Sequence, residues 1–306
     1  MSIHQRIEGE LVSPRLEPLA EAPVGLSPTR ELWRKFRKQK VAMVALVFLV
    51  LVILVAVFAK WVAPQDPDFQ TPLINRSPSS AHWLGTDDVG RDILSRIIFG
   101  SRVSLRAAFQ IVFMALAIAL PVGLISGYFG RWVDALIMRV TDAMFAFPPL
   151  ILALSVVALL GRSFSHTMLA ISIAFSPGFI RLIRAQVLAV REETYIEASR
   201  SVGAGSTRMI TRHVLPNVAS PMIVQVALSF GYALLSEAGL SFLGLGVQPP
   251  TPSWSIMLSR AYSFILDTSW PLFPPGVAIL LTVLAFNMVG DGLRDALGRE
   301  TFKVER

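Results

Sequence analysis

The sequence predicts an all-α membrane protein that crosses the bilayer six times. The chain of 306 residues is 53% hydrophobic and only 16% charged, and its mean hydropathy is +0.58. A water-soluble core cannot bury so much apolar surface, so the composition indicates a bilayer protein. A hydrocarbon core of about 30 Å takes about 20 helical residues to span. Stretches of about this length without Asp, Glu, Lys or Arg are residues 41–59, 107–129, 143–161, 163–180, 218–236 and 272–290.

The chain before the first span is predicted to be a cytoplasmic tail, residues 1–40. Four prolines and the lack of an apolar period indicate that residues 1–29 are mobile, and six basic residues crowd the rest of the tail. The first transmembrane helix is assigned to residues 41–62. No small-residue cleavage site follows before Lys60, so we expect this span to stay in the protein rather than be removed as a signal peptide.

Basic residues predict the orientation of the spans, because Lys and Arg collect on the cytoplasmic side. They crowd the segment before the first span and residues 181–217, whereas the link between spans three and four and the link between spans five and six hold one Arg each. Both termini are therefore expected in the cytoplasm. The loop 63–102 is expected outside. It is not poor in basic residues, which its Asp residues balance, so this loop alone does not determine the orientation. A transmembrane core is assigned to residues 103–297 and a cytoplasmic tail to residues 298–306.

The residue inventory excludes most chemistry within the chain. There is no Cys, so disulfides, thiolate metal sites and cysteine nucleophiles are absent. No G-x-x-x-x-G-K-[ST] motif is present to hold nucleotide phosphates, and the four His residues lack metal-ligand spacing. The net charge of +7 is explained by basic residues that flank the spans. We therefore predict no catalytic residue, cofactor, metal or nucleic-acid partner, and any ATP must be bound by another polypeptide.

The segment 191–217 departs most from an ordinary loop between two spans. Its polar, helix-favouring sequence predicts two short helices joined at Gly203-Ala204-Gly205, with Gly203 in a positive-φ cap and Ser206 or Thr207 capping the second helix. Pro216 is expected to end regular helix before the fifth span begins. A short helix with a narrow apolar stripe on a cytoplasmic loop is suited to docking against another protein.

Several motifs in this order resemble one family. Glu197-Ala198-Ser199, Gly203 and Leu215-Pro216 resemble the E-A-A loop of the permease subunits of bacterial ABC importers, with Ser199 in place of the second Ala and His213 in place of Ile. Arg200 lies within the same motif. The stretches that resemble the dipeptide, oligopeptide and nickel branch, and in particular its second, C-type subunit, are Leu84–Asp87, Gly90–Asp92, Leu240–Gly246, Gln248–Pro252 and Gly290–Asp295. Ser255 departs from the Gly that is usual after the Trp in this branch.

The resemblance implies the type I ABC importer transmembrane fold with a cytoplasmic coupling helix. It implies a pathway shared with a homologous second permease subunit in the bacterial inner membrane. Its further implied partners are two cytoplasmic ABC ATPase subunits, which would bind ATP and Mg, and an extracytoplasmic substrate-binding protein. The coupling loop would be residues 191–217. By this resemblance, the residues of the motif that would contact the ATPase are Glu197, Ala198, Ser199, Arg200, Gly203, Leu215 and Pro216.

Prolines and charges near the spans leave further alternatives open. A proline within a membrane frees backbone groups that must face protein or a cavity, so Pro148, Pro149 and Pro177 either shape a pathway or only pack. Arg139 and Asp142 are interpreted as an interfacial ion pair, in preference to a proton relay.

The Gly90–Asp92 turn is interpreted as a helix start, in preference to a substrate site. Its Asp92, with Arg96 and Arg102, is expected on a solvated helix face.

Two other classes of protein compete with the importer. A self-sufficient channel or ion-driven transporter should carry ionisable residues in the middle of its spans, and here the polar groups are mainly neutral, such as Gln225. A membrane scaffold has no use for an ordered set of pathway kinks. Among importers, di- or oligopeptides are the main substrate prediction, and a glutathione-like peptide or a nickel chelate stays open.

Overall fold

The computed structural model describes residues 28–298, and this part of the chain is built from helices and loops without a strand. The predictions for residues 1–27 and 299–306 lie outside the described residues. Within residues 28–298, five helices are long and apolar enough to cross a membrane, and a bent pair can form a sixth crossing. The helices are α1 (Pro28–Arg37), α2 (Lys40–Val57), α3 (Ala59–Val62), α4 (Ile93–Phe129), α5 (Arg131–Phe145), α6 (Pro149–Leu160), α7 (Phe164–Arg191), α8 (Thr194–Ser201), α9 (Ser206–Met209), a π-helical turn (Ile210–Val214), α10 (Leu215–Phe242), α11 (Trp254–Ser263), a 3₁₀ turn (Trp270–Leu272) and α12 (Phe273–Gly298).

The second span is much longer than its apolar run. α4 has 37 residues, which at 1.5 Å per residue is about 55 Å, well beyond a hydrocarbon core of about 30 Å. It begins at Ile93, within the segment predicted to be loop up to residue 102, because the Asp92 side chain accepts a hydrogen bond from the Ser95 amide and caps the helix. Pro121 lies inside α4 without interrupting it.

The third predicted span, residues 143–161, is not one straight helix. α5 and α6 meet at a bend of 96°. Pro148 has an extended ψ of 133°, because the ring of Pro149 disfavours a helical conformation in the residue before it. Pro149 then occupies the first position of α6, where a missing N–H is tolerated. The proline pair therefore redirects the chain within its apolar run.

The bundle is built around the close packing of α4 against α7. Gly123 and Gly127 form a small-xxx-small pair on α4, and an added Cβ at these positions would lie 2.8 Å from Ile183 and 2.7 Å from Val187. Backbones approach this closely only where side chains are missing, which is the usual device of helix pairs in membranes. Ile183 and Val187 are completely buried.

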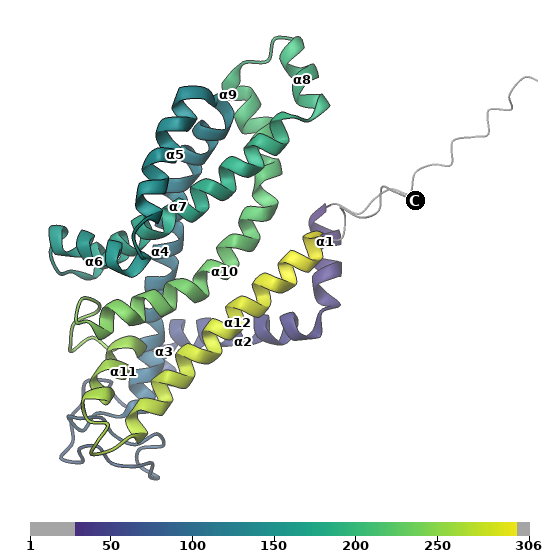
Figure 1. Ribbon diagram of the computed structural model, residues 1–306. Helices are drawn as coiled ribbons and strands as arrows, with labels where there is room; N and C mark the ends of the chain where they lie inside the picture. The colour runs from purple at the N-terminus through teal and green to yellow at the C-terminus, as the bar shows by residue number, and fades with distance from the viewer. Residues whose placement is uncertain (1–27, 299–306) are drawn as a thin grey trace, which may run out of the picture.

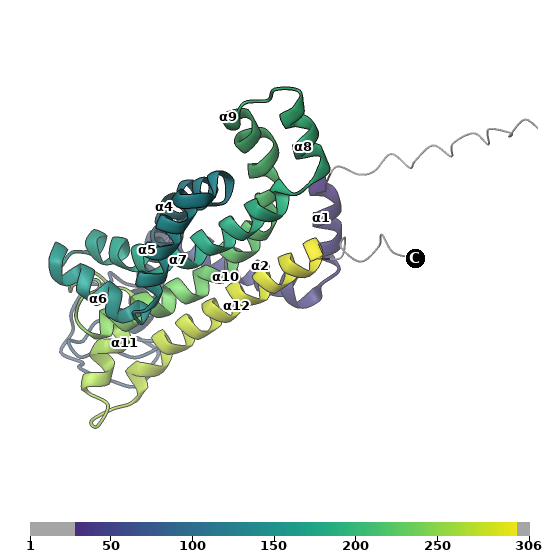
Figure 2. The ribbon, with the colours of Figure 1, turned by 45° about the horizontal axis from the view of Figure 1, so that its top comes forward.

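The two ends of the bundle are different in structure. α1, α8, α9 and the C-terminal end of α12 lie toward one end, called the α8 end below, and residues 63–92 with α11 lie toward the opposite end, called the α11 end (Figure 1). The turned view in Figure 2 shows the same separation, with α8 and α9 projecting beyond the long helices.

Two arginines of α7 join this helix to α4 and α5. Arg191 donates to the carbonyl oxygens of Gly127 and Tyr128 at 3.0 and 2.9 Å, so it satisfies the C-terminal carbonyls of α4. The predicted pairing of Asp142 with Arg139 is wrong, because Asp142 accepts a hydrogen bond from Arg181 on α7 at 2.6 Å. The bend after α5 places this carboxylate beside α7.

Candidate functional site

The helix α8 is the most protruding element of the 191–217 loop. Only Ile196 on α8 is fully buried and anchors the helix, while the other side chains of α8 are exposed or half-buried. Of the seven predicted motif residues, five are exposed, and four of these, Glu197, Ala198, Arg200 and Gly203, lie on α8 or at its end. Ser199 and Leu215 are half-buried and Pro216 is exposed. Val202, at the end of α8, is 85% exposed. The loop thus presents a charged helix with an uncovered apolar residue at its tip.

Gly203 ends α8 in a Schellman motif. Its φ is +83°, the left-handed region that a residue with a Cβ rarely adopts. The Ala204 amide donates to the Ser199 carbonyl at 3.1 Å and the Gly203 amide to the Arg200 carbonyl at 3.0 Å, which are the two hydrogen bonds that define this cap. The predicted Gly cap is confirmed, and the motif's spacing of four residues between Ser199 and Gly203 is the spacing that the cap requires.

The second half of the loop differs from the sequence prediction in two places. Gly205, rather than Ser206 or Thr207, caps α9, and it provides no side-chain hydrogen bond. The helix does not end at Pro216, because residues 206–242 run as one helical stretch through the π turn into α10. Pro216 lies in the first turn of α10, and the absence of an N–H donor on proline is tolerated there.

A groove of 450 Å³ lies at the bend between α5 and α6. Pro148 and Pro149 line it from the bend. The face of α10 that lines the same groove is a stripe of uncharged polar side chains at helical spacing. This stripe consists of Gln225, Ser229, Tyr232 and Ser236. Tyr232 is 65% exposed, so a tyrosine stands open in the middle of an apolar helix.

A second cavity, of 530 Å³, continues from the groove toward the α8 end. Gln225 lines both spaces, and the second is bounded by α7, α10 and the end of α12. Arg294 is the charged residue of its lining. Pro177 lines neither space and is buried inside α7, although its neighbour Gly178 reaches the groove. Among the three predicted prolines, the structure thus brings the 148–149 pair to the groove and leaves Pro177 in the packing.

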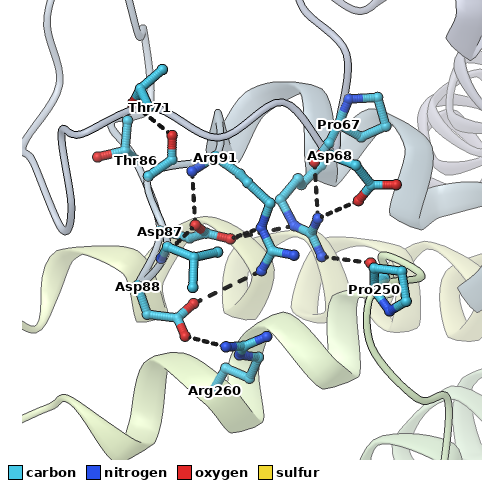
Figure 3. A network of polar contacts seen from close by, with 12 residues as sticks. Pro67, Asp68, Thr71, Thr86, Asp87, Asp88, Arg91, Pro250 and Arg260 are labelled. Carbon is cyan, nitrogen blue, oxygen red and sulfur yellow. Dashed lines mark hydrogen bonds and ion pairs between the residues drawn. The ribbon is translucent and has the colours of Figure 1, made fainter.

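Residues 63–92 fold into a cap held by ion pairs and hydrogen bonds at the α11 end (Figure 3). Arg91 Nε donates to Asp87 at 2.8 Å. Arg96, only 2% exposed, donates to Asp68 at 3.1 Å and to the carbonyl of Pro250 at 3.2 Å. An arginine of α11, Arg260, pairs with Asp88. The cap therefore joins the loop after the first span to the loop after the fifth.

The predicted solvated helix face at the start of α4 is wrong. Asp92 and Arg96 are both buried, because the cap covers them. Asp92 caps α4 and also lies 3.0 Å from His82 Nδ1, another buried side chain. Arg102 is exposed, but it donates to the carbonyl oxygen of Val57 at 2.6 Å near the end of α2. The Gly90–Asp92 turn is a helix start, as predicted.

Sequence analysis missed one buried carboxylate. Glu237 has no exposed surface, and it accepts hydrogen bonds from Ser241 at 2.7 Å and from Ser255 of α11. It follows the apolar run 218–236 directly, so it was counted as part of the next loop. Ser255, which stands where Gly is usual, gives this carboxylate its second donor. The sequence shows this departure but not the carboxylate that it contacts.

Comparisons with known proteins agree with this architecture. The family described as "Binding-protein-dependent transport system inner membrane component" matches residues 119–303, and the "N-terminal TM domain of oligopeptide transport permease C" matches residues 27–79. The inward-facing MetNI methionine ABC transporter has a chain that aligns with a TM-score of 0.54 at 16% identity, over 65% of this chain and 95% of that one. At that identity, the likeness concerns the fold alone.

Curated relatives cover nearly the whole chain. The dipeptide transport system permease protein DppC of Alkalihalophilus pseudofirmus is 45% identical over 286 residues, which are 93% of this chain and 94% of the relative. The glutathione transport system permease protein GsiD of Pectobacterium atrosepticum is 44% identical over 273 residues, 89% and 91% of the two chains. The chain therefore belongs to the inner-membrane permease subunits of ABC importers, in the family of the dipeptide and oligopeptide permeases.

Proposed function

We propose that this chain forms half of the translocation pathway of an ATP-driven importer of di- and oligopeptides. A homologous second permease subunit would complete the pathway. Two ABC ATPase subunits would bind ATP and Mg, and an extracytoplasmic binding protein would deliver the substrate. The observation that carries the proposal is α8, an exposed and capped helix on the loop that joins two spans.

The geometry of α8 suits a contact that transmits force. Glu197 and Arg200 offer charges to a partner, and the exposed Val202 offers an apolar contact. Buried Ile196 fixes the helix to the bundle, and the cap at Gly203 fixes its end. An ATPase subunit that moves on binding ATP would therefore displace α8 as a unit and shift the packing of the spans between two states.

The groove at the α5–α6 bend supports the pathway assignment. A stripe of polar side chains that faced lipid would leave its hydrogen-bonding groups unsatisfied, which is costly in a hydrocarbon core. Gln225, Ser229 and Tyr232 instead face a space that a second permease subunit would close. The stripe carries no charge, so it would bind the polar main chain of a peptide without selecting among charged side chains.

The fold also supports the proposed orientation, with both termini and α8 in the cytoplasm. Three arginines at the α11 end, Arg91, Arg96 and Arg260, pair with Asp residues of the cap. On the 191–217 loop, Arg200, Arg208 and Arg212 are exposed. Free positive charge therefore concentrates at the α8 end, as the positive-inside rule requires of the cytoplasmic side.

The relatives narrow the substrate class without choosing within it. One is named for dipeptides and another for glutathione, at nearly equal identity. Both ligands are short peptides with an uncharged amide main chain, which suits the neutral stripe of α10. A glutathione-like peptide is therefore the second candidate, and a nickel chelate is the third.

Reconstitution tests the proposed function. The chain, its partner permease and the ATPase subunits are placed in lipid vesicles with the cognate binding protein, and uptake of labelled Ala-Ala, glutathione and nickel is measured with and without ATP. We expect ATP-dependent uptake of the dipeptide and no flux through the chain alone. Flux without any ATPase subunit would favour the rival channel or ion-driven transporter. ATP-driven uptake of glutathione or nickel alone would change the substrate and leave the importer assignment standing.

A further inference from the structure

α10 is attached at its N-terminal end to α8, through Tyr195. Asn217, in the first turn of α10, donates a hydrogen bond from Nδ2 to the Tyr195 hydroxyl at 3.0 Å. The same amide group donates to the carbonyl oxygen of His213 at 2.7 Å. The Tyr195 ring also lies 6.3 Å from the His213 ring. One tyrosine of α8 therefore contacts both the π turn and the start of α10.

α10 is attached at its α11 end through Glu237. The two carboxylate oxygens are divided between two elements, because Ser241 of α10 donates to one and Ser255 of α11 donates to the other. The chain that follows α10 packs closely against Ser241, since a Cβ added to Gly246 would lie 1.8 Å from Ser241 Oγ. A fully buried carboxylate depends on its donors, because losing one leaves an oxygen desolvated and unpaired.

We propose that α10 transmits movement between α8 and α11, with Tyr195 and Ser255 as the positioning residues at its two joints. Residues 206–242 form a continuous helical stretch of 37 residues, about 55 Å long and therefore long enough to reach beyond both faces of the bilayer. The inference rests on the proposed function, because an ATPase subunit must move α8. It adds the route by which that movement reaches the cap side of the molecule.

The route predicts that the two joints act in series. If movement passes along α10 from Tyr195 to Ser255, breaking either joint interrupts it, and breaking the second adds nothing. α11 also contacts α4 independently, since the Trp254 amide donates to Ser104 at 3.1 Å. If movement instead reached α11 through α4, the joints would act separately and their losses would multiply.

A reporter on the loop after α11 measures the transmission without any substrate. Leu266 is 98% exposed, and the chain has no cysteine, so Leu266→Cys can carry a single environment-sensitive fluorophore. The complete complex in lipid receives ATP and vanadate, and the trapped nucleotide is quantified beside the fluorescence change. Tyr195→Phe removes only the hydroxyl that Asn217 contacts, and Ser255→Ala removes only the donor to Glu237.

We expect each variant to trap as much nucleotide as the parent does. Its fluorescence change should be about fivefold smaller than that of the parent, a factor within the range of ordinary coupling energies. The double variant should respond no less than the weaker single one. Glu237→Gln keeps an acceptor for Ser255 and should retain the response. Matched controls are Ser155→Ala and Ser263→Ala, which remove hydroxyls that bond only within their own helices.

The outcomes separate the inference from the proposed function. A parent-like response in either single variant, or losses that multiply in the double variant, overturns the series route. Trapped nucleotide with no response at position 266 in the parent also overturns it, while the importer assignment stands. A parent complex that traps no nucleotide refutes the proposed function itself.

Discussion

Gly203 is the position where the 191–217 loop should be most sensitive to a side chain. Its φ of +83° costs a residue with a Cβ about 1–2 kcal/mol. No heavy atom lies within 4 Å of an added Cβ, so no steric clash adds to this cost. Gly203→Ser should therefore destabilise the capped conformation by about 1–2 kcal/mol, which is about 5–30-fold in its population.

Gly205 provides the matched control two residues away. It also has open space around an added Cβ, but its φ is −69° and its ψ is 156°, which any residue adopts. It caps α9, and Ser is a preferred residue at that position. Gly205→Ser introduces the same side chain and should change the stability of the loop by only a few tenths of a kcal/mol.

Amide hydrogen exchange measures the difference directly. The Ala204 amide is held by the Ser199 carbonyl at 3.1 Å, so its exchange reports the opening of the cap. In the purified chain, exchange at Ala204 should be about 5–30-fold faster in Gly203→Ser than in Gly205→Ser. In the complex, the first variant should also lower the stimulation of ATPase activity by the binding protein. Equal exchange in the two variants would refute the reasoning from φ.

Three further predictions concern stability, topology and the groove. Asp92→Ala should lower the free energy of unfolding by about 2–4 kcal/mol, because it removes a helix cap and leaves a buried histidine unpaired, whereas Asp92→Asn should lose much less in thermal unfolding; equal losses would contradict the capping role. A cysteine replacing Leu266 should react with an impermeant thiol reagent in intact cells and one replacing Arg208 should not, and the reverse pattern would invert the orientation. Leu150→Trp should lower substrate uptake while the complex is present in normal amount, whereas Phe147→Trp, outside the groove lining, should not. Unchanged uptake in both variants would show that the bend only packs the helices and does not line the pathway.

Local features of the fold could be predicted from the sequence. Apolar runs locate spans because a bilayer of fixed thickness demands them, and the Gly cap of α8 depends only on residues within one turn. The bend between α5 and α6 lies inside an apolar run, and the hydropathy of such a run does not show in which direction the chain turns. Pro148-Pro149 marked a break, but the bend of 96° places α6 against α7 and α10, which are distant in the sequence.

Contacts between distant segments could not be predicted. Asp142 has an Arg three residues before it, yet it pairs with Arg181, 39 residues away. Arg96 finds the carbonyl of Pro250 at a separation of 154 residues. Exposure of a charged side chain at a helix start was the simplest expectation, and it failed because residues 63–92 fold back over α4. A composition rule cannot anticipate such a cover, since the cap has no apolar period.

The two departures from the family motif in the 191–217 loop are explained by which atoms the fold uses. Ser199 replaces an Ala, and the cap takes only its backbone carbonyl, while its hydroxyl donates within α8 to the Tyr195 carbonyl at 2.8 Å. His213 replaces an Ile, and it supplies a carbonyl to Asn217 and a ring to Tyr195. Gly203 has no such freedom, because its contribution is a positive φ. A motif built on backbone geometry therefore tolerates new side chains at its acceptor positions and resists them at its glycine.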